Sequence, residues 1–207
     1  MREQKIKTAA VTPAYMEYEL SIEGTETTIP SGTGLLLVHP STGQTDRIDT
    51  DFLKADTDHL FVISTRTTAR EVQQKLEHYE VDETTATILD ALSVERGYSR
   101  RRSDRVKYVS TPEDLDGVVT QTREFLDGHE GKLRISVDSI TEMSYYAGED
   151  RVLTAVEKLL ALLEEYDAVG LFHLARGVHD DESLARFETL FDGTIELAED
   201  GTVTTSV

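Results

Sequence analysis

The sequence predicts an α/β protein with three layers, in which helices cover both faces of a mostly parallel central sheet. Several apolar runs of strand length lack polar alternation, which suits strands that are buried on both faces. Segments with helical spacing of apolar residues alternate with these runs along the chain, as they do in parallel α/β folds. The last two strand-like segments, at residues 195–197 and 202–205, flank a turn and predict a C-terminal β-hairpin.

One domain over residues 15–207 accounts for these elements, preceded by a loose N-terminal arm over residues 1–14; either Met1 or Met16 could be the natural start. Residues 15–22 alternate in polarity, which predicts an edge strand, and the Thr-, Ser-, Gly- and Pro-rich residues 24–34 are expected to form a loop. Further strands are expected at residues 35–38, 59–64, 87–92, 106–110, 132–138 and 167–173. Helices are expected at residues 46–54, 68–79, 111–127, 139–146, 149–166 and 181–191.

Two helix starts carry recognisable capping signals. Thr67 or Thr68 can cap the second helix, because Glu71 follows at the spacing of a capping box. Thr111 and Pro112 are expected to open the third helix with proline at its first position.

The composition restricts the class of protein. The 207 residues include no cysteine, and 40 Asp and Glu against 21 Lys and Arg give a formal net charge of −19. Such self-repulsion is tolerated best in molar salt, where the screening length falls to about 3 Å, so we expect a halophilic protein of a high-salt cytoplasm. The acidic balance argues against nucleic acid as a partner. No apolar run approaches the roughly 20 residues of a membrane span, and a soluble protein is expected.

The stretch over residues 34–45 is the centre of the functional argument. An uncharged apolar strand ends in a Pro, Ser, Thr and Gly turn, which is the outline of a phosphate-binding loop, G-x-x-x-x-G-K-[ST]. Gly43 and Thr45 match that pattern, whereas Val38 replaces its first glycine and Gln44 replaces its lysine. The alternative is an ordinary strand–turn–helix corner.

The replaced lysine matters chemically. Such loops hold phosphates with backbone N–H groups, while the lysine neutralises the phosphate oxygens. Gln44 can donate a hydrogen bond but carries no charge, and Thr45 could still offer its hydroxyl to Mg²⁺.

Asp138 is the second candidate, because it ends a buried strand. An acid there could bind Mg²⁺ or orient water, or it could simply cap the next helix. The strand that ends at Asp138 is expected to lie beside the strand that leads to Thr45, which would bring these two side chains together.

Four segments together resemble the RecA/KaiC-like P-loop ATPases, and most of all their degenerate haloarchaeal members. They are IPSGTGLLLV (29–38) with TGQT (42–45), LFVISTR (60–66), ISVDSIT (135–141) and VGLFHL (169–174). The resemblance covers residues 29–197. It implies that Thr42, Gly43 and Thr45 lie at the phosphate loop with Gln44, that Asp138 lies at the Mg²⁺ site, and that His173 lies near a polar sensing position.

Two departures from this family argue against catalysis. Gln44 replaces the lysine, and residues 64–66 stand at the strand end where the family carries a glutamate that activates water. Losing both groups removes nucleophile activation and charge stabilisation, so efficient ATP hydrolysis is not expected. Arg66 could replace the missing charge, or it could be an exposed residue near a helix start.

A basic segment stands out in the acidic chain. It holds Tyr98, Lys107 and five arginines, namely Arg96, Arg100, Arg101, Arg102 and Arg105. It could dock an acidic partner, a neighbouring subunit or nucleic acid, or it could be a solvated loop. The spacing of the histidines predicts no metal site.

The function expected from the sequence is a catalytically degenerate regulatory or scaffolding module that binds a protein partner or itself. The first alternative is a switch that binds ATP and Mg²⁺ without efficient hydrolysis, and the second is a working ATPase with a rearranged site. ATP and Mg²⁺ are the only cofactors that the sequence suggests, bound through Thr45 and Asp138.

Overall fold

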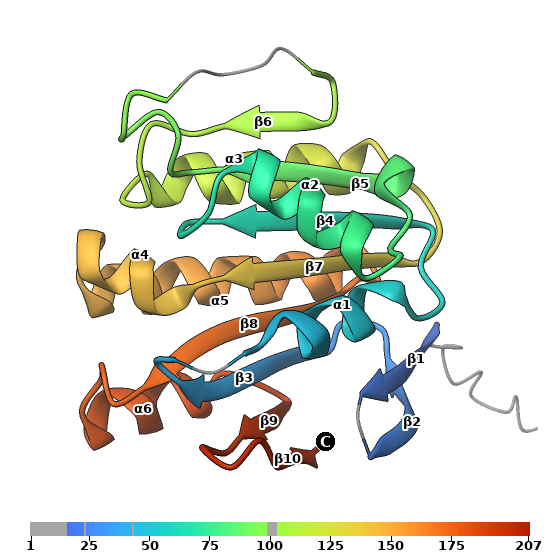
Figure 1. The fold of residues 1–207 in the computed structure, drawn as a ribbon, viewed down its shortest axis with the longest axis vertical. Helices are drawn as coiled ribbons and strands as arrows, with labels where there is room; N and C mark the ends of the chain where they lie inside the picture. The colour runs from blue at the N-terminus through green and yellow to red at the C-terminus, as the bar shows by residue number, and fades with distance from the viewer. Residues whose placement is uncertain (1–15, 23, 43, 99–102) are drawn as a thin grey trace, which may run out of the picture.

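The computed structural model describes residues 16–22, 24–42, 44–98 and 103–207, so the whole of the predicted N-terminal arm, residues 1–14, lies outside the described residues. Its centre is an eight-stranded sheet of order β10-β9-β3-β8-β7-β4-β5-β6 (Figure 1). Neighbouring strands are parallel except for β9 and β10, which form an antiparallel hairpin at one edge. The predicted mostly parallel sheet with a C-terminal hairpin is therefore confirmed.

The strands of this sheet follow the predicted apolar runs closely. They span Gly34–Pro40 (β3), His59–Ser64 (β4), Ala86–Asp90 (β5), Val106–Tyr108 (β6), Leu133–Asp138 (β7), Val169–Arg176 (β8), Gly193–Leu197 (β9) and Val203–Ser206 (β10). Successive residues of a strand point to opposite faces. In β3, Leu36 and Val38 accordingly join one buried cluster, while Leu35 and Leu37 join the other.

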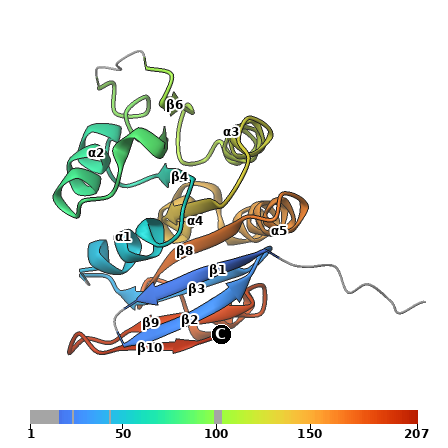
Figure 2. The ribbon, with the colours of Figure 1, turned by 90° about the vertical axis from the view of Figure 1, so that its right-hand side faces the viewer.

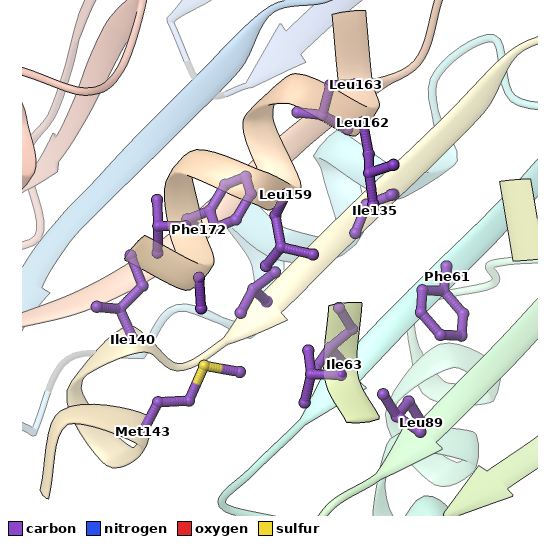
Figure 3. Packing of buried hydrophobic residues seen from close by; sticks show 14 of the residues in the cluster. Phe61, Ile63, Leu89, Ile135, Ile140, Met143, Leu159, Leu162, Leu163 and Phe172 are labelled. Carbon is purple, nitrogen blue, oxygen red and sulfur yellow. The ribbon is translucent and has the colours of Figure 1, made fainter. Parts of the chain in front are cut away.

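Helices cover both faces of the sheet (Figure 2). One face carries Asp46–Lys54 (α1) and Ala69–His78 (α2), and the other carries Leu115–Asp127 (α3), Ile140–Ala147 (α4), Glu149–Glu165 (α5) and Asp181–Glu188 (α6). A short 3-10 helix, η1, spans Glu83–Thr85. Figure 3 shows the core under α5, where Leu159 and Leu162 approach Ile135 of β7. None of the helices in the described part of the chain is both long and apolar enough to cross a membrane.

A second, two-stranded sheet lies on the α1 and α2 face and corrects the predicted loop over residues 24–34. Glu17–Ile22 (β1) pairs antiparallel with Thr25–Pro30 (β2). Threonine is common in loops, but its β-branched side chain also favours strands, and Ile29 of β2 is buried. The hydroxyl of Tyr18 donates to the carbonyl of Asp167 at 2.8 Å and accepts from the N–H of Leu133 at 2.9 Å. These bonds attach the hairpin to the central sheet.

The two capping predictions have different outcomes. Thr68 caps α2, and Glu71 completes the capping box, as predicted. Helix α3 begins at Leu115 and not near Pro112, because the carboxylate of Asp114 accepts from the N–H of Gly117 and starts the helix there.

The strand order overturns one prediction about the site. Strand β8 lies between β3 and β7 and pairs with both, so the strand leading to Thr45 is not a neighbour of the strand ending at Asp138. Both strands are apolar and parallel, and nothing in such a pattern specifies which third strand separates them.

Candidate functional site

The carboxyl ends of β3, β4, β7 and β8 form one edge of the sheet, where parallel α/β folds place their functional loops (Figure 1). The turn after β3 leads into α1, with Thr45 as the residue before the helix. Thr42 and Gln44 are exposed, whereas Thr45 is only 5% exposed. Gly43 lies outside the described residues.

A cavity of about 800 Å³ opens beside this turn. Thr42 and Gln44 line it together with Arg47, Tyr79 and the turn between β9 and β10, which includes Asp200. The structure therefore brings Thr42, Gln44 and an aromatic side chain together around the cavity, whereas the two candidate Mg²⁺ ligands, Thr45 and Asp138, are not among its described lining residues.

Asp138 is engaged by Arg66. The Arg66 Nε lies 2.8 Å from Oδ1 of Asp138, and its Nη2 lies 3.1 Å from Oδ2, which makes a bidentate pair. Burial by itself would raise the pKa of the Asp138 carboxyl, but His173 and Arg66 hold it below its ordinary value. Arg66 is exposed near a helix start, as one of the two interpretations expected, yet its charge is directed at the carboxylate. A guanidinium therefore lies where the resemblance implies a metal ion.

The end of β4 is bonded firmly to the end of β7. The N–H of Thr65 donates to the carbonyl of Asp138 at 2.8 Å, and the Thr65 hydroxyl accepts from the N–H of Ser139 at 2.8 Å. Ser64 directs its hydroxyl to the carbonyl of Thr67 at 2.8 Å. Because Ser64, Thr65 and Arg66 carry no carboxylate, this strand end offers no general base for activating water.

A buried charged cluster lies beneath the turn. Asp49 of α1 is 0% exposed, and Lys75 of α2 donates to its Oδ2 at 2.8 Å. Its Oδ1 accepts from the hydroxyl of Ser136 in β7 and lies 3.2 Å from Nε2 of His173 in β8. Burial alone would raise the pKa of Asp49, but Lys75 and His173 hold it far below its ordinary value. The resemblance placed His173 near a polar sensing position, and its observed partner is this carboxylate.

Sequence reasoning missed Asp49, Lys75 and Ser136. Asp49 lies on the same helical turn as the buried Ile48 and Phe52, and Ser136 stands inside an apolar strand. A polar residue at a buried position needs a partner, and that signal was available. The identity of the partner depends on the strand order, which the sequence does not reveal.

A pair of imidazoles completes the interior of this site. The rings of His39 and His173 meet edge to face with centroids 5.8 Å apart. Burial lowers the pKa of His39, whose Nδ1 lies 2.9 Å from the carbonyl of Pro40. No group of three or more His, Cys, Asp or Glu side chains suited to a metal ion occurs within the described ranges.

Asp90, at the end of β5, is another buried acid that sequence reasoning did not single out. Its carboxylate accepts from the N–H groups of Ala69, Leu92 and Ser93 and from the Ser93 hydroxyl, at 2.7–3.0 Å. Four donors satisfy it within the fold, so it positions the start of α2 and the loop after β5.

The basic segment is only partly described. Arg100, Arg101 and Arg102 lie outside the described residues, and Arg105 is exposed. Hydrogen bonds to Tyr98 and Tyr146 raise the pKa of Arg96. This arginine therefore links the loop after β5 to helix α4.

Solved structures of other proteins share this fold, among them a KaiC-like protein and a secretion ATPase. A KaiC-like protein from the hyperthermophilic archaeon Pyrococcus horikoshii is 14% identical with a TM-score of 0.58, covering 92% of this chain and 86% of that one. A type III secretion ATPase of pathogenic bacteria is 13% identical with a TM-score of 0.62 over 97% of this chain, which spans 66% of that ATPase. An uncharacterised P. horikoshii protein in complex with an unknown peptide is 15% identical with a TM-score of 0.58, covering 86% and 83%.

The chain itself belongs to a family of unknown function, DUF7090, whose profile matches residues 16–207. A search among curated proteins finds no match. At 13–15% identity the structural neighbours establish the fold alone, so the function has to be argued from the site.

Proposed function

We propose that this chain is a catalytically degenerate RecA/KaiC-like protein of a high-salt cytoplasm, which acts as a regulatory or scaffolding module by binding a protein partner or a second copy of itself. The observation that carries the proposal is the bidentate pair between Arg66 and Asp138. The guanidinium neutralises this carboxylate and would repel a Mg²⁺ ion bound to the same group.

The other charges near the site support the same proposal. Gln44 is uncharged, and Lys75, a half-buried lysine of α2, is paired with Asp49 at 2.8 Å and lies 3.7 Å from Asp46. Arg66 and Lys75 thus each have an internal carboxylate partner. The residues present do not fit Mg²⁺-dependent hydrolysis.

The cavity beside Thr42 and Gln44 favours a second candidate function. Its volume of about 800 Å³ and its Tyr79 lining could accept a nucleotide base and sugar without any contact to Asp138. In that case the chain would be a switch that binds nucleotide, without efficient hydrolysis, and biases a partner-facing surface.

A comparison of four proteins tests both functions in molar KCl. Phosphate release from ATP and calorimetric ATP binding are measured for the wild type, Thr45→Ala, Asp138→Ala and the surface control Arg151→Ala. Arg151 is an exposed residue that pairs with Glu113. The proposal expects no turnover in any protein and no detectable binding at millimolar ATP.

The other outcomes separate the alternatives. Micromolar ATP binding without turnover would favour the switch. Loss of that binding in Asp138→Ala would show that the Arg66–Asp138 pair opens when the nucleotide binds. Turnover in the wild type and in Arg151→Ala that disappears in Thr45→Ala would contradict the degenerate assignment. Sedimentation velocity on the same samples tests self-association.

A further inference from the structure

A separate cavity of about 430 Å³ lies at the opposite edge of the sheet, where strands β4 and β5 begin. We define the histidine groove by six of its lining residues, His59, Thr87, Lys107, Gln121, Glu124 and His129. The carboxyl ends of the same strands lead to the candidate functional site, so the two sites are on opposite edges (Figure 1). The volume is that of a small-molecule site.

Four aromatic rings in contact line the groove, and only Phe61 and Phe125 among them are stacked, since His129 is tilted by 31° to Phe125 and His59 by 53° to His129. Phe61 and Phe125 stack at 4.8 Å with an interplanar angle of 13°, His129 lies 4.4 Å from Phe125, and His59 lies 4.5 Å from His129. The two phenylalanines are buried, and the two imidazoles at the end of the series are half-buried. A half-buried ring at the end of such a series offers a face on which another planar ring can stack.

The polar groups of the groove are arranged on two walls. Lys107 comes from β6 and Glu124 comes from α3, and within the described ranges no ion pair joins them. Glu124 accepts from the Gln121 amide at 2.9 Å, and Lys107 is exposed. The Nδ1 of His129 donates to the carbonyl of Phe125 at 2.7 Å, which in the neutral ring leaves Nε2 as an acceptor.

We infer that the histidine groove binds a small planar aromatic molecule that carries both an acidic and a basic group, of the aromatic amino acid class. The ring would stack on the imidazoles, the ligand's carboxylate would pair with Lys107, and its ammonium would pair with Glu124. Asp104 and Arg105, which also line the cavity, add one further charge of each sign, so the lining carries no net charge in a chain of net charge −19. A lining with both signs suits a zwitterion better than a simple anion or cation.

L-Tryptophan is a suitable probe, because the chain contains no tryptophan and excitation near 295 nm therefore reports on the ligand alone. Titration of L-tryptophan with the purified chain in molar KCl should give a saturable change in fluorescence anisotropy. Lys107→Met and Glu124→Gln should each weaken binding about tenfold, the effect of losing one charged hydrogen bond. Lys158→Met and Glu165→Gln are matched controls on α5, where both side chains are exposed, and should leave the affinity unchanged.

Three results would overturn the inference. They are the absence of saturation at millimolar protein, equal affinity in the groove variants and the controls, and binding of uncharged indole as tight as that of tryptophan. Thermal unfolding of each variant verifies that the fold is intact, which is expected because Lys107 and Glu124 lie at the surface. This test does not involve ATP, so its outcome is independent of the proposed function.

Discussion

The ammonium of Lys75 lies 2.8 Å from a carboxylate oxygen of Asp49, a side chain with no solvent exposure. The pair joins α2 to α1, and Ser136 and His173 extend it into the sheet. Helix α1, which follows the phosphate-loop-like turn, is thus held to α2 by charge as well as by apolar packing.

Removing one partner of this pair should be costly. Lys75→Met leaves a buried carboxylate without its cation, and we expect the free energy of unfolding to fall by about 3 kcal/mol or more. Urea denaturation measures the change. Lys158→Met, which removes an exposed lysine 3.5 Å from Asp116, should change stability by less than about 1 kcal/mol. Similar losses in the two variants would mean that the buried pair contributes no more than a surface one.

Acid should weaken the fold through Asp49 and Asp138. The pKa values of both carboxyls are held below their ordinary value in the folded protein, although burial opposes this, so the unfolded state binds more protons as the pH falls. The stability that they contribute is present above about pH 4 and is lost as the pH drops below it. Unfolding measured from pH 5 to pH 2 should therefore show a smaller dependence on pH in Asp49→Asn than in the wild type. An equal dependence on pH in the two proteins would show that Asp49 does not cause the loss of stability in acid.

His39 should produce a second, milder dependence at higher pH. Burial lowers its pKa in the folded state, and the nearby His173 and Arg66 act in the same direction, against the Pro40 carbonyl and Asp138. In the unfolded chain the His39 imidazole is protonated near pH 6.5, whereas in the folded protein it stays neutral to a lower pH. The free energy of unfolding should therefore fall as the pH drops below about 6.5.

The measurement for His39 is the unfolding free energy between pH 7.5 and pH 5. The change of this free energy with pH should be smaller in His39→Gln than in the wild type, and it should be retained in His78→Gln, which changes an exposed histidine. An unaltered slope in His39→Gln would assign the effect to another group.

Arg134 is a buried cation with no carboxylate partner among the described residues, and it can be used to test how much such a charge contributes to stability. It is 0% exposed, its guanidinium carbon lies 5.3 Å from the Tyr18 ring centre and 4.9 Å from that of Phe52, and burial lowers its pKa to about 10. Its Nη2 donates to the carbonyl of Glu19, but Nε and Nη1 have no hydrogen-bond partner in the described structure.

Because two donors are unsatisfied, an apolar side chain of similar length should be tolerated at this position. Arg134→Met should change the unfolding free energy by less than about 1 kcal/mol or increase it, whereas Arg134→Ala should cost about 3 kcal/mol through the cavity that it leaves. Chemical denaturation of the two variants measures these changes in the free energy of unfolding. A large loss in Arg134→Met would show that the cation itself, between its two aromatic rings, stabilises the hairpin of β1 and β2.

Most of the fold could be predicted from the sequence, because uninterrupted apolar runs such as residues 35–38 are strong signals for strands buried on both faces. The β2 strand was missed because Thr25, Thr27 and Thr28 occur in loops as readily as in strands. The start of α3 was misplaced because Pro112 and Asp114 are both credible first-turn signals, and only the structure shows which one is used.

The candidate site could be predicted only in part. The sequence singled out Asp138 and Arg66 separately, but their contact depends on β4 and β7 being neighbours. The position of β8 between β3 and β7 likewise decides that His173 meets Asp49. Strand order is a property of long-range packing, and local patterns do not encode it.

The position of β3 also has a consequence for how the molecule folds. Its pairing partners are β8 and β9, so residue 34 pairs with residue 170, and most of the chain has to be synthesised before this pairing can form. Contacts between such distant residues slow folding, because a long loop has to close before any pairing energy is gained. Until then the apolar residues 35–38 lack both neighbouring strands, and in the nascent chain they are a segment at risk of aggregation and a natural place for a chaperone to bind.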